Sequence, residues 1–162
     1  MGYKTSLTNH VVRLIHLKGL PAVKAQQCQA LRREAGRCWS DLVALHRESR
    51  ARKDWLSAGE LQKQFAGAGY ALHSQTVQAL AQKLDANLQT ARQLRQQETA
   101  GGGDIRTEYP WCPKAYQTVV WKESAIHIGD GAIRRSNGQG REPLVLPRPA
   151  EYQTVAVCRA AL

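Results

Sequence analysis

Apolar residues recur at helical spacing over most of the first hundred positions. Pro21 suits a first helical turn, where its missing N–H would have no partner. After it, apolar side chains follow at alternating steps of three and four residues, which is the spacing of one helix face. This stripe consists of Cys28, Leu31, Ala35, Cys38, Leu42 and Leu45, with Trp39 beside it. The pattern predicts a long amphipathic helix from Pro21 to about Arg50.

Two further helices are predicted downstream. Ser57 and Glu60 have the spacing of a capping box, which opens a short helix through Phe65. A third helix begins near Ser74 and runs to about Gln97. Its buried side is predicted to consist of Val77, Leu80, Ala81, Leu84, Leu88, Ala91 and Leu94. Its other side is rich in Gln, which is typical of a solvated face, although amides also read base edges and bind phosphate.

The helical periodicity ends at Gly101–Gly103, and these three glycines predict a flexible joint. Short runs rich in β-branched and aromatic residues follow. The strand candidates are Gln117–Trp121, Ala125–Ile128, Ala132–Arg135, Leu144–Leu146 and Thr154–Val157. Asp130-Gly131 between two of these runs is a strong hairpin signal.

An isolated apolar run, His10–Lys18, precedes the first helix and is also predicted to be a strand. Its backbone groups need partners, and the only predicted strands lie after Gly103. The sequence therefore predicts an α+β fold, a small antiparallel β-barrel interrupted by a helical insertion. Residues 1–20 and 101–162 would build the barrel, and residues 21–100 the helical lobe.

Positive charge is concentrated at the start of the chain. The formal net charge is +10, and 11 of the 23 Lys and Arg residues fall within the first 53 positions. Arg33, Arg37 and Arg47 lie opposite the apolar stripe of the first helix. A folded helix with one basic face and one buried face indicates a polyanion partner, above all nucleic acid. The simpler alternative is a solvated charged face.

Catalytic and metal-binding signatures are missing from the sequence. The four cysteines form no Cys-x-x-Cys pair and have no histidine at zinc-finger spacing, so we expect no disulfide, metal or cofactor. The acids Asp104, Glu108, Asp130 and Glu142 sit at turns, whereas two-metal nucleases need carboxylates that converge on rigid elements. No apolar run approaches the ~20 residues of a membrane span. We expect a soluble cytoplasmic protein.

Several runs carry a family resemblance. They are Leu31–Leu42, Trp55–Lys63, Leu72–Leu80 and Tyr116–Lys122, the last continuing through Ile126, Asp130-Gly131 and Ile133. In this order they resemble the amino-terminal part of TnpB, the OrfB-type protein of bacterial insertion sequences, which is related to type V CRISPR effectors. The resemblance spans roughly residues 31–152. Its motifs are moderately specific, and none is a catalytic signature.

The resemblance implies a wedge barrel interrupted by a helical recognition lobe, in agreement with the topology above. The family cleaves DNA under RNA guidance with a RuvC nuclease domain, whose acids these 162 residues do not contain. We therefore expect a non-catalytic part that binds a structured guide RNA and target DNA, acting with a separate RuvC-bearing polypeptide or as a truncated product. We expect no cleavage by this chain alone.

The expected contacts follow from charge and from the resemblance. The residues predicted to bind RNA phosphates are Arg33, Arg37, Arg47, Arg50, Lys114, Lys122, Arg134 and Arg135. Those predicted to approach DNA are Ser74, Gln75 and Gln78, at the start of the third helix, where backbone N–H groups favour phosphate. Two alternatives stay open. One is a sequence-specific DNA-binding repressor without RNA, and the other is a helical module that binds an acidic protein.

Overall fold

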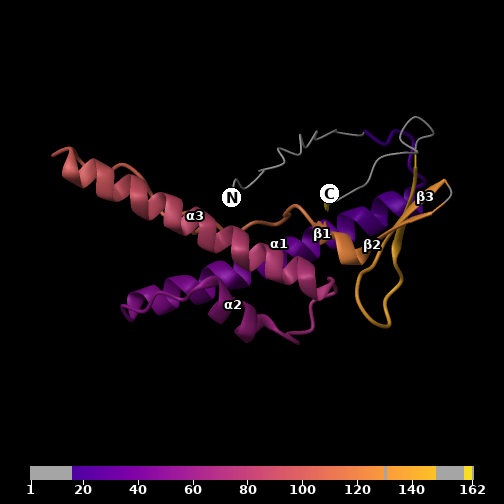
Figure 1. Cartoon of the computed structure of the whole chain (residues 1–162), viewed down its shortest axis with the longest axis horizontal. Helices are drawn as coiled ribbons and strands as arrows, with labels where there is room; N and C mark the ends of the chain where they lie inside the picture. The colour runs from indigo at the N-terminus through magenta and orange to yellow at the C-terminus, as the bar shows by residue number, and fades with distance from the viewer. Residues whose placement is uncertain (1–15, 130, 149–158, 162) are drawn as a thin grey trace, which may run out of the picture.

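The described part of the chain contains three α-helices, one short 3₁₀ helix and five short strands. The computed structural model describes residues 16–129, 131–148 and 159–161, the last three by their backbone alone. The helices are α1 (Ala22–Ala51), α2 (Ala58–Phe65) and α3 (Ser74–Ala100). Figure 1 shows α1 and α3 crossing as two long rods, with α2 beside them and the strands gathered near the amino-terminal end of α1.

Helix α1 confirms the predicted amphipathic pattern. Leu31, Ala35, Cys38 and Leu42 on its stripe are buried, and Trp39 beside them is only 2% exposed. The outer members of the stripe, Cys28 and Leu45, are partly buried against the same core. Because 30 residues in one helix present a single continuous apolar face, α1 can pack against both α3 and strand β4 (Leu144–Pro147).

The starts of α2 and α3 are capped in different ways. The predicted capping box of α2 is present: Glu60 N–H donates to Ser57 Oγ, and Ser57 N–H donates to the Glu60 carboxylate. Helix α3 is capped by His73, whose Nδ1 accepts from Gln75 N–H at 3.2 Å. Histidine is not among the preferred N-cap residues, so this cap could not be predicted from residue type.

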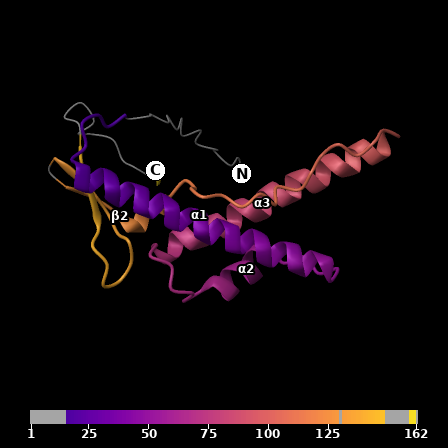
Figure 2. The same cartoon turned by 180° about the vertical axis from the view of Figure 1, so that it is seen from behind.

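The apolar face of helix α3 is buried over only about its first two thirds. Val77, Leu80, Ala81, Leu84, Leu88 and Ala91 are buried as predicted. The prediction for Leu94 is wrong, because its side chain is 45% exposed. After the helix, Gly101 and Gly103 donate to the carbonyls of its last turn, and the chain reverses direction. It then runs back beside α3 toward the strands, as Figure 2 shows.

The strands form two small open antiparallel sheets. Strands β2 (Ile126–Gly129), β3 (Ala132–Arg135) and β4 lie in that order in one sheet. Strand β1 (Val120–Lys122) pairs with β5 (Arg159–Ala161) in the other. The predicted hairpin is confirmed, since Gly129 pairs with Ala132 across the turn. Gly131 has a φ of +71°, a region that glycine enters without steric cost.

The barrel prediction is only partly met. The described residues give an α+β fold, and they contain no closed barrel. Within the predicted first strand, positions 10–15 lie outside the described residues, and positions 16–18 are not in a strand. The candidate Thr154–Val157 also lies outside them. Positions 123–125 form a short 3₁₀ helix, so the predicted strand begins one residue later than expected.

One hydrophobic core joins the helices to the strands. Trp121 of β1, with Leu144 and Leu146 of β4, belongs to the same cluster as the buried faces of α1 and α3. Thr76 Oγ1 at the start of α3 donates to the Val120 carbonyl at 2.9 Å. The strands thus hold the beginning of α3 and one side of α1 in fixed positions, and the basic residues of both helices are placed by this packing.

Candidate nucleic-acid interface

A segment with three aromatic residues lies against α1. This segment, residues 109–116, is called the aromatic loop below; it reads Tyr-Pro-Trp-Cys-Pro-Lys-Ala-Tyr. It runs antiparallel to the helix. Trp39 Nε1 donates to the Cys112 carbonyl at 3.0 Å. Just beyond the loop, Gln117 N–H donates to the Arg32 carbonyl at 3.0 Å.

The loop approaches α1 most closely at Gly36. A Cβ placed on Gly36 would lie 2.5 Å from the Ala115 carbonyl oxygen, closer than van der Waals contact permits. One turn further along, Ser40 Oγ accepts from Lys114 N–H at 3.0 Å and lies 2.9 Å from the Gly36 carbonyl, to which it donates. Glycine and serine at these two positions therefore let the loop backbone lie directly on the helix.

This contact gathers positive charge around an exposed aromatic ring. The guanidiniums of Arg32 and Arg33 each lie 5.8 Å from the centre of the Tyr116 ring, which is 46% exposed. Lys114 Nζ lies 5.5 Å from the Trp39 ring. Arg32, Arg33, Lys114 and Tyr116 are called the Tyr116 site. The Arg33 guanidinium, 3.5 Å from the phenol oxygen, lowers the pKa of Tyr116.

The other predicted arginines of α1 have different surroundings. Arg37 pairs with Glu34 at 2.6 Å and lies over the Tyr70 ring, so its charge is already balanced within the protein. Arg47 is exposed. Arg50 lies 4.7 Å from the centre of the Trp55 ring, near the carboxyl-terminal end of the helix. Of the predicted RNA contacts, the structure therefore brings together only Arg33 and Lys114 at the Tyr116 site.

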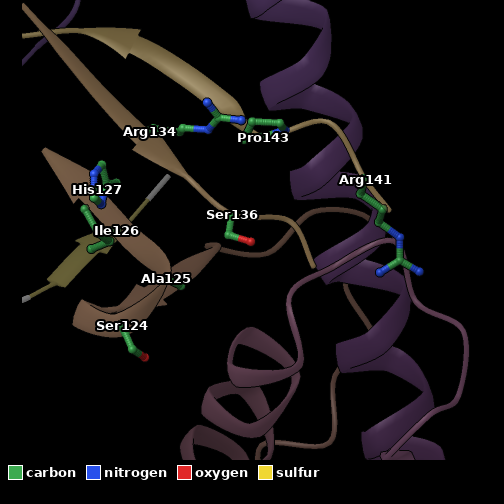
Figure 3. Close-up of a pocket in the computed structure, with 8 residues that line it drawn as sticks. All are labelled: Ser124, Ala125, Ile126, His127, Arg134, Ser136, Arg141 and Pro143. Atoms are coloured by element: carbon green, nitrogen blue, oxygen red, sulfur yellow. The ribbon is translucent and has the colours of Figure 1, made fainter. Parts of the chain in front are cut away.

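The sheet contributes a second basic surface, shown in Figure 3. Arg134 of β3 and His127 of β2 are cross-strand partners, so their exposed side chains lie on the same face. They line an open pocket of about 420 Å³ together with Arg141 from the loop before β4. Lys122 of β1 is half-buried.

Arg135 does not belong to the protein surface. Its side chain is 9% exposed, and its guanidinium lies 5.4 Å from the centre of the Trp121 ring. Burial lowers its pKa. The alternation of side chains along β3 explains the difference from Arg134, because successive residues of a strand point to opposite faces. The side chain of Arg135 thus faces the core, and we leave it out of the interface.

The residues predicted to approach DNA are not equivalent. Ser74 and Gln78 line a pocket of about 490 Å³, whose rim also carries Arg141 and Gln139. The Gln75 amide lies away from that pocket. It exchanges two hydrogen bonds with Ser124 Oγ, at 2.7 and 2.9 Å, and so ties α3 to the segment before β2.

The first turn of α3 offers fewer free N–H groups than the sequence indicates. Gln75 N–H donates to His73 Nδ1, and the N–H groups of Thr76 and Val77 both reach the His73 carbonyl. Burial lowers the pKa of His73, which favours the neutral imidazole that this cap requires. A phosphate at this helix end would therefore have to be bound by side chains, chiefly Ser74, Gln78 and Arg141.

Sequence reasoning missed the aromatic loop and Arg32. The signal was present, since eight positions hold three of the ten Trp, Tyr and Phe residues, with a lysine between them. Interleaved aromatic and basic residues are typical of nucleic-acid surfaces. The loop has no regular period, however, so the pattern gave no reason to place it against α1.

Metal and membrane chemistry are not indicated by the described residues. Among them, no group of three or more His, Cys, Asp or Glu side chains could hold a metal ion. No helix in the described ranges is long and apolar enough to cross a bilayer.

In comparisons with known proteins, the chain matches no protein-family model, no curated protein and no solved structure.

Proposed function

We propose that this chain binds RNA through the basic face of α1 and the aromatic loop. The observation that carries the proposal is the Tyr116 site, where the guanidiniums of Arg32 and Arg33 lie at an exposed ring and Lys114 of the same loop lies over Trp39. In the residues that the structure describes, the only ion pair joins Arg37 to Glu34, so none of these three cations is neutralised by a carboxylate. Phosphates would supply the missing counter-charge, and Tyr116 would offer a stacking face to an unpaired base.

The resemblance of the sequence to TnpB supports a more specific form of the proposal. In it, the chain is the wedge barrel and recognition lobe of an RNA-guided system. It holds a structured guide RNA, and cutting is done by a RuvC-bearing polypeptide in trans. The described α+β arrangement, with a helical lobe between a short leading segment and the strands, is compatible with that assignment.

The pocket beside α3 is our candidate for the DNA contact. Ser74 and Gln78 provide a hydroxyl and an amide, and Arg141 provides a guanidinium, all within one pocket. Amides can pair bidentately with adenine edges, and arginine with guanine. Because Gln75 is held by Ser124, we expect Gln78→Ala to alter DNA sequence preference more than Gln75→Ala does. RNA affinity should change little in either variant.

The test of RNA binding uses charge-removing variants. Purified protein should show a high 260/280 nm absorbance ratio that falls after ribonuclease treatment. The triple variant Arg32→Gln, Arg33→Gln, Lys114→Gln should then reduce the slope of log affinity against log salt by about 2–3, at ~0.7–0.9 per lost phosphate contact. The matched control replaces Arg52, Lys63 and Arg106, which are also exposed, and removes the same charge elsewhere.

The same experiment separates the alternatives. Binding of duplex DNA but not RNA, with no effect of ribonuclease, would favour the alternative of a sequence-specific DNA-binding repressor. Equal binding of RNA and poly-glutamate would favour the acidic-protein partner. If the control variant lost as much affinity as the triple variant, the Tyr116 site would not be the contact surface.

A further inference from the structure

A second group of cations lies at the other end of the aromatic loop. The guanidiniums of Arg50 and Arg92, from α1 and α3, lie 4.7 and 5.3 Å from the centre of the Trp55 ring. The guanidinium of Arg95 lies 5.0 Å from the centre of the Tyr109 ring. Both rings belong to one aromatic cluster, since their centres are 5.5 Å apart. Three arginines from two helices are thus gathered on two touching rings.

No carboxylate of the described residues forms an ion pair with these arginines, and the one that Arg95 acts on, Glu98, has its pKa lowered mainly by hydrogen bonds from Thr107. The nearby acids have other partners or lie too far away for an ion pair: Glu98 accepts from Thr107 and from the backbone of Arg106, and Asp85 accepts from Gln89. Asp54 is exposed and pairs with no cation in the described ranges. The like charges of the three guanidiniums repel one another. The aromatic faces therefore hold together three cations, none of which forms an ion pair within the described residues.

The arginines also keep most of their donors available. Arg95 donates to the Thr107 carbonyl at 2.6 Å. Within the described residues, the Arg50 and Arg92 side chains donate no hydrogen bond. A guanidinium held by stacking presents its N–H edge outward with little loss of entropy on binding, and that edge matches a phosphate. Arg92 is exposed, so its edge can be reached from solvent.

We propose that Arg50, Arg92 and Arg95, stacked on Trp55 and Tyr109, form a second phosphate-binding site for the same RNA. This inference rests on the proposed function and extends it. Arg33 and Arg50 are seventeen residues apart on α1, which is roughly 25 Å at ~1.5 Å per residue. The aromatic loop connects the two sites along the helix. One RNA bound at both must reach over that length, so the protein selects an extended or structured RNA over a short one.

The experiment measures fluorescence anisotropy with two labelled RNA stem-loops, of 4 and 16 base pairs. Both stems are A-form duplexes, and the first is shorter and the second longer than the separation of the two sites. The double variant Arg92→Gln, Arg95→Gln should weaken the long stem-loop about 25- to 60-fold in 0.1 M salt. Its salt slope should fall by about 1.4–1.8, the value for two phosphates. Affinity for the short stem-loop at the Tyr116 site should fall far less.

The matched control is Arg52→Gln, Lys63→Gln, which removes the same charge from exposed positions. A small effect of the control with a large effect of the double variant supports the second site. Equal losses in the two variants, or a double variant that binds the long stem-loop like the wild type, overturn it while the proposed function stands. A wild type that binds neither RNA overturns both.

A fallback keeps the test decisive if the double variant unfolds, which circular dichroism would show. Arg92 is exposed, and Arg92→Glu alone should then give the loss on the long stem-loop. An unchanged affinity in that variant would reject the site. Poly-glutamate that competed as well as RNA of the same charge would show that the site does not recognise phosphate.

Discussion

At the scale of single residues, Gly36 decides whether the aromatic loop can lie on α1. We predict that Gly36→Ala displaces the loop, because the new Cβ would meet the Ala115 carbonyl at 2.5 Å and two further backbone atoms within 2.7 Å. Overpacking of this kind costs ~1–3 kcal/mol, and RNA affinity should fall with it. Thermal unfolding should report a melting temperature lower by about 3–10 °C.

Gly59 supplies the control for this substitution. It lies in the first turn of α2, where an added Cβ would have no neighbour closer than 3.9 Å. Gly59→Ala should therefore be neutral or stabilise the protein by up to ~1 kcal/mol, since alanine has the higher helix propensity. A Gly36→Ala protein as stable as the Gly59→Ala protein would show that the loop does not contact the helix.

Two histidines, the buried His46 and the partly buried His73, should make stability depend on pH. Burial lowers the pKa of His46 and of His73 below the ordinary 6.5. Both imidazoles thus bind protons more readily in the unfolded chain, so their contribution is favourable above about pH 6.5 and is lost as the pH falls below it. Carboxylates whose pKa is lowered, such as Glu34, titrate at more acidic pH and do not obscure this window.

The check is the free energy of unfolding between pH 7.5 and 5. It should decline in the wild type and decline less in the double variant His46→Phe, His73→Asn. Phenylalanine keeps an aromatic ring beside Trp55, and asparagine can cap α3 without titrating. Identical slopes in the wild type and the double variant would count against this account.

At the scale of elements, α3 has a stabilising part and a projecting part. Leu84 is fully buried, whereas Leu94 is 45% exposed. We predict that Leu84→Ala costs ~2–5 kcal/mol, the usual range for a buried leucine. Leu94→Ala should cost far less, about 0.5 kcal/mol or below, as for ordinary surface positions. Urea unfolding of both variants tests this, and equal losses would place Leu94 in the core.

The contrast between Leu84 and Leu94 also shows what the sequence could predict. Periodicity and capping chemistry are local, so they placed all three helices, the α2 capping box and the β2–β3 hairpin. The same periodicity continues past Ala91, although no helix among the described residues covers the Leu94 side chain, which is 45% exposed. Which part of an apolar stripe is buried depends on how far its neighbours extend, and that information is not local.

The candidate interface divides in the same way. Charge and helical phase correctly placed Arg33 and Arg47 on the surface, and alternation along a strand could have separated Arg134 from Arg135. Arg33 and Lys114 were predicted contacts, but their grouping with Arg32 and Tyr116 in one site could not be predicted. It depends on a loop without a period, which reaches α1 only because residues 36 and 40 are small. It therefore needed the tertiary structure.

At the scale of the whole molecule, the excess of positive charge in the first third of the sequence lies largely on one helix, α1. The first 53 residues carry 11 basic and 3 acidic side chains, and the aromatic loop lies on the helix that holds most of them. The cation cluster at one end of this loop joins α1 to the loop, and the cluster at the other end joins α1 to α3. A polyanion bound along α1 would bridge elements that are far apart in the sequence. Binding should therefore stabilise the fold as a whole.

This bridging gives a prediction for thermal stability. RNA that binds the folded chain preferentially stabilises it by about 2.7 kcal/mol at a hundredfold excess over Kd. For a protein of this size, that corresponds to a rise in melting temperature of about 5–11 °C. The rise should shrink steeply between 0.05 and 0.5 M salt, because each phosphate contact releases counterions.

The Tyr116-site triple variant should show a smaller rise than the Arg52, Lys63, Arg106 control. Poly-glutamate of equal charge should stabilise less, because a carboxylate chain offers no bases to Tyr116. A rise of equal size with poly-glutamate, or one that persists in 0.5 M salt, would contradict binding through phosphates and point to a protein partner.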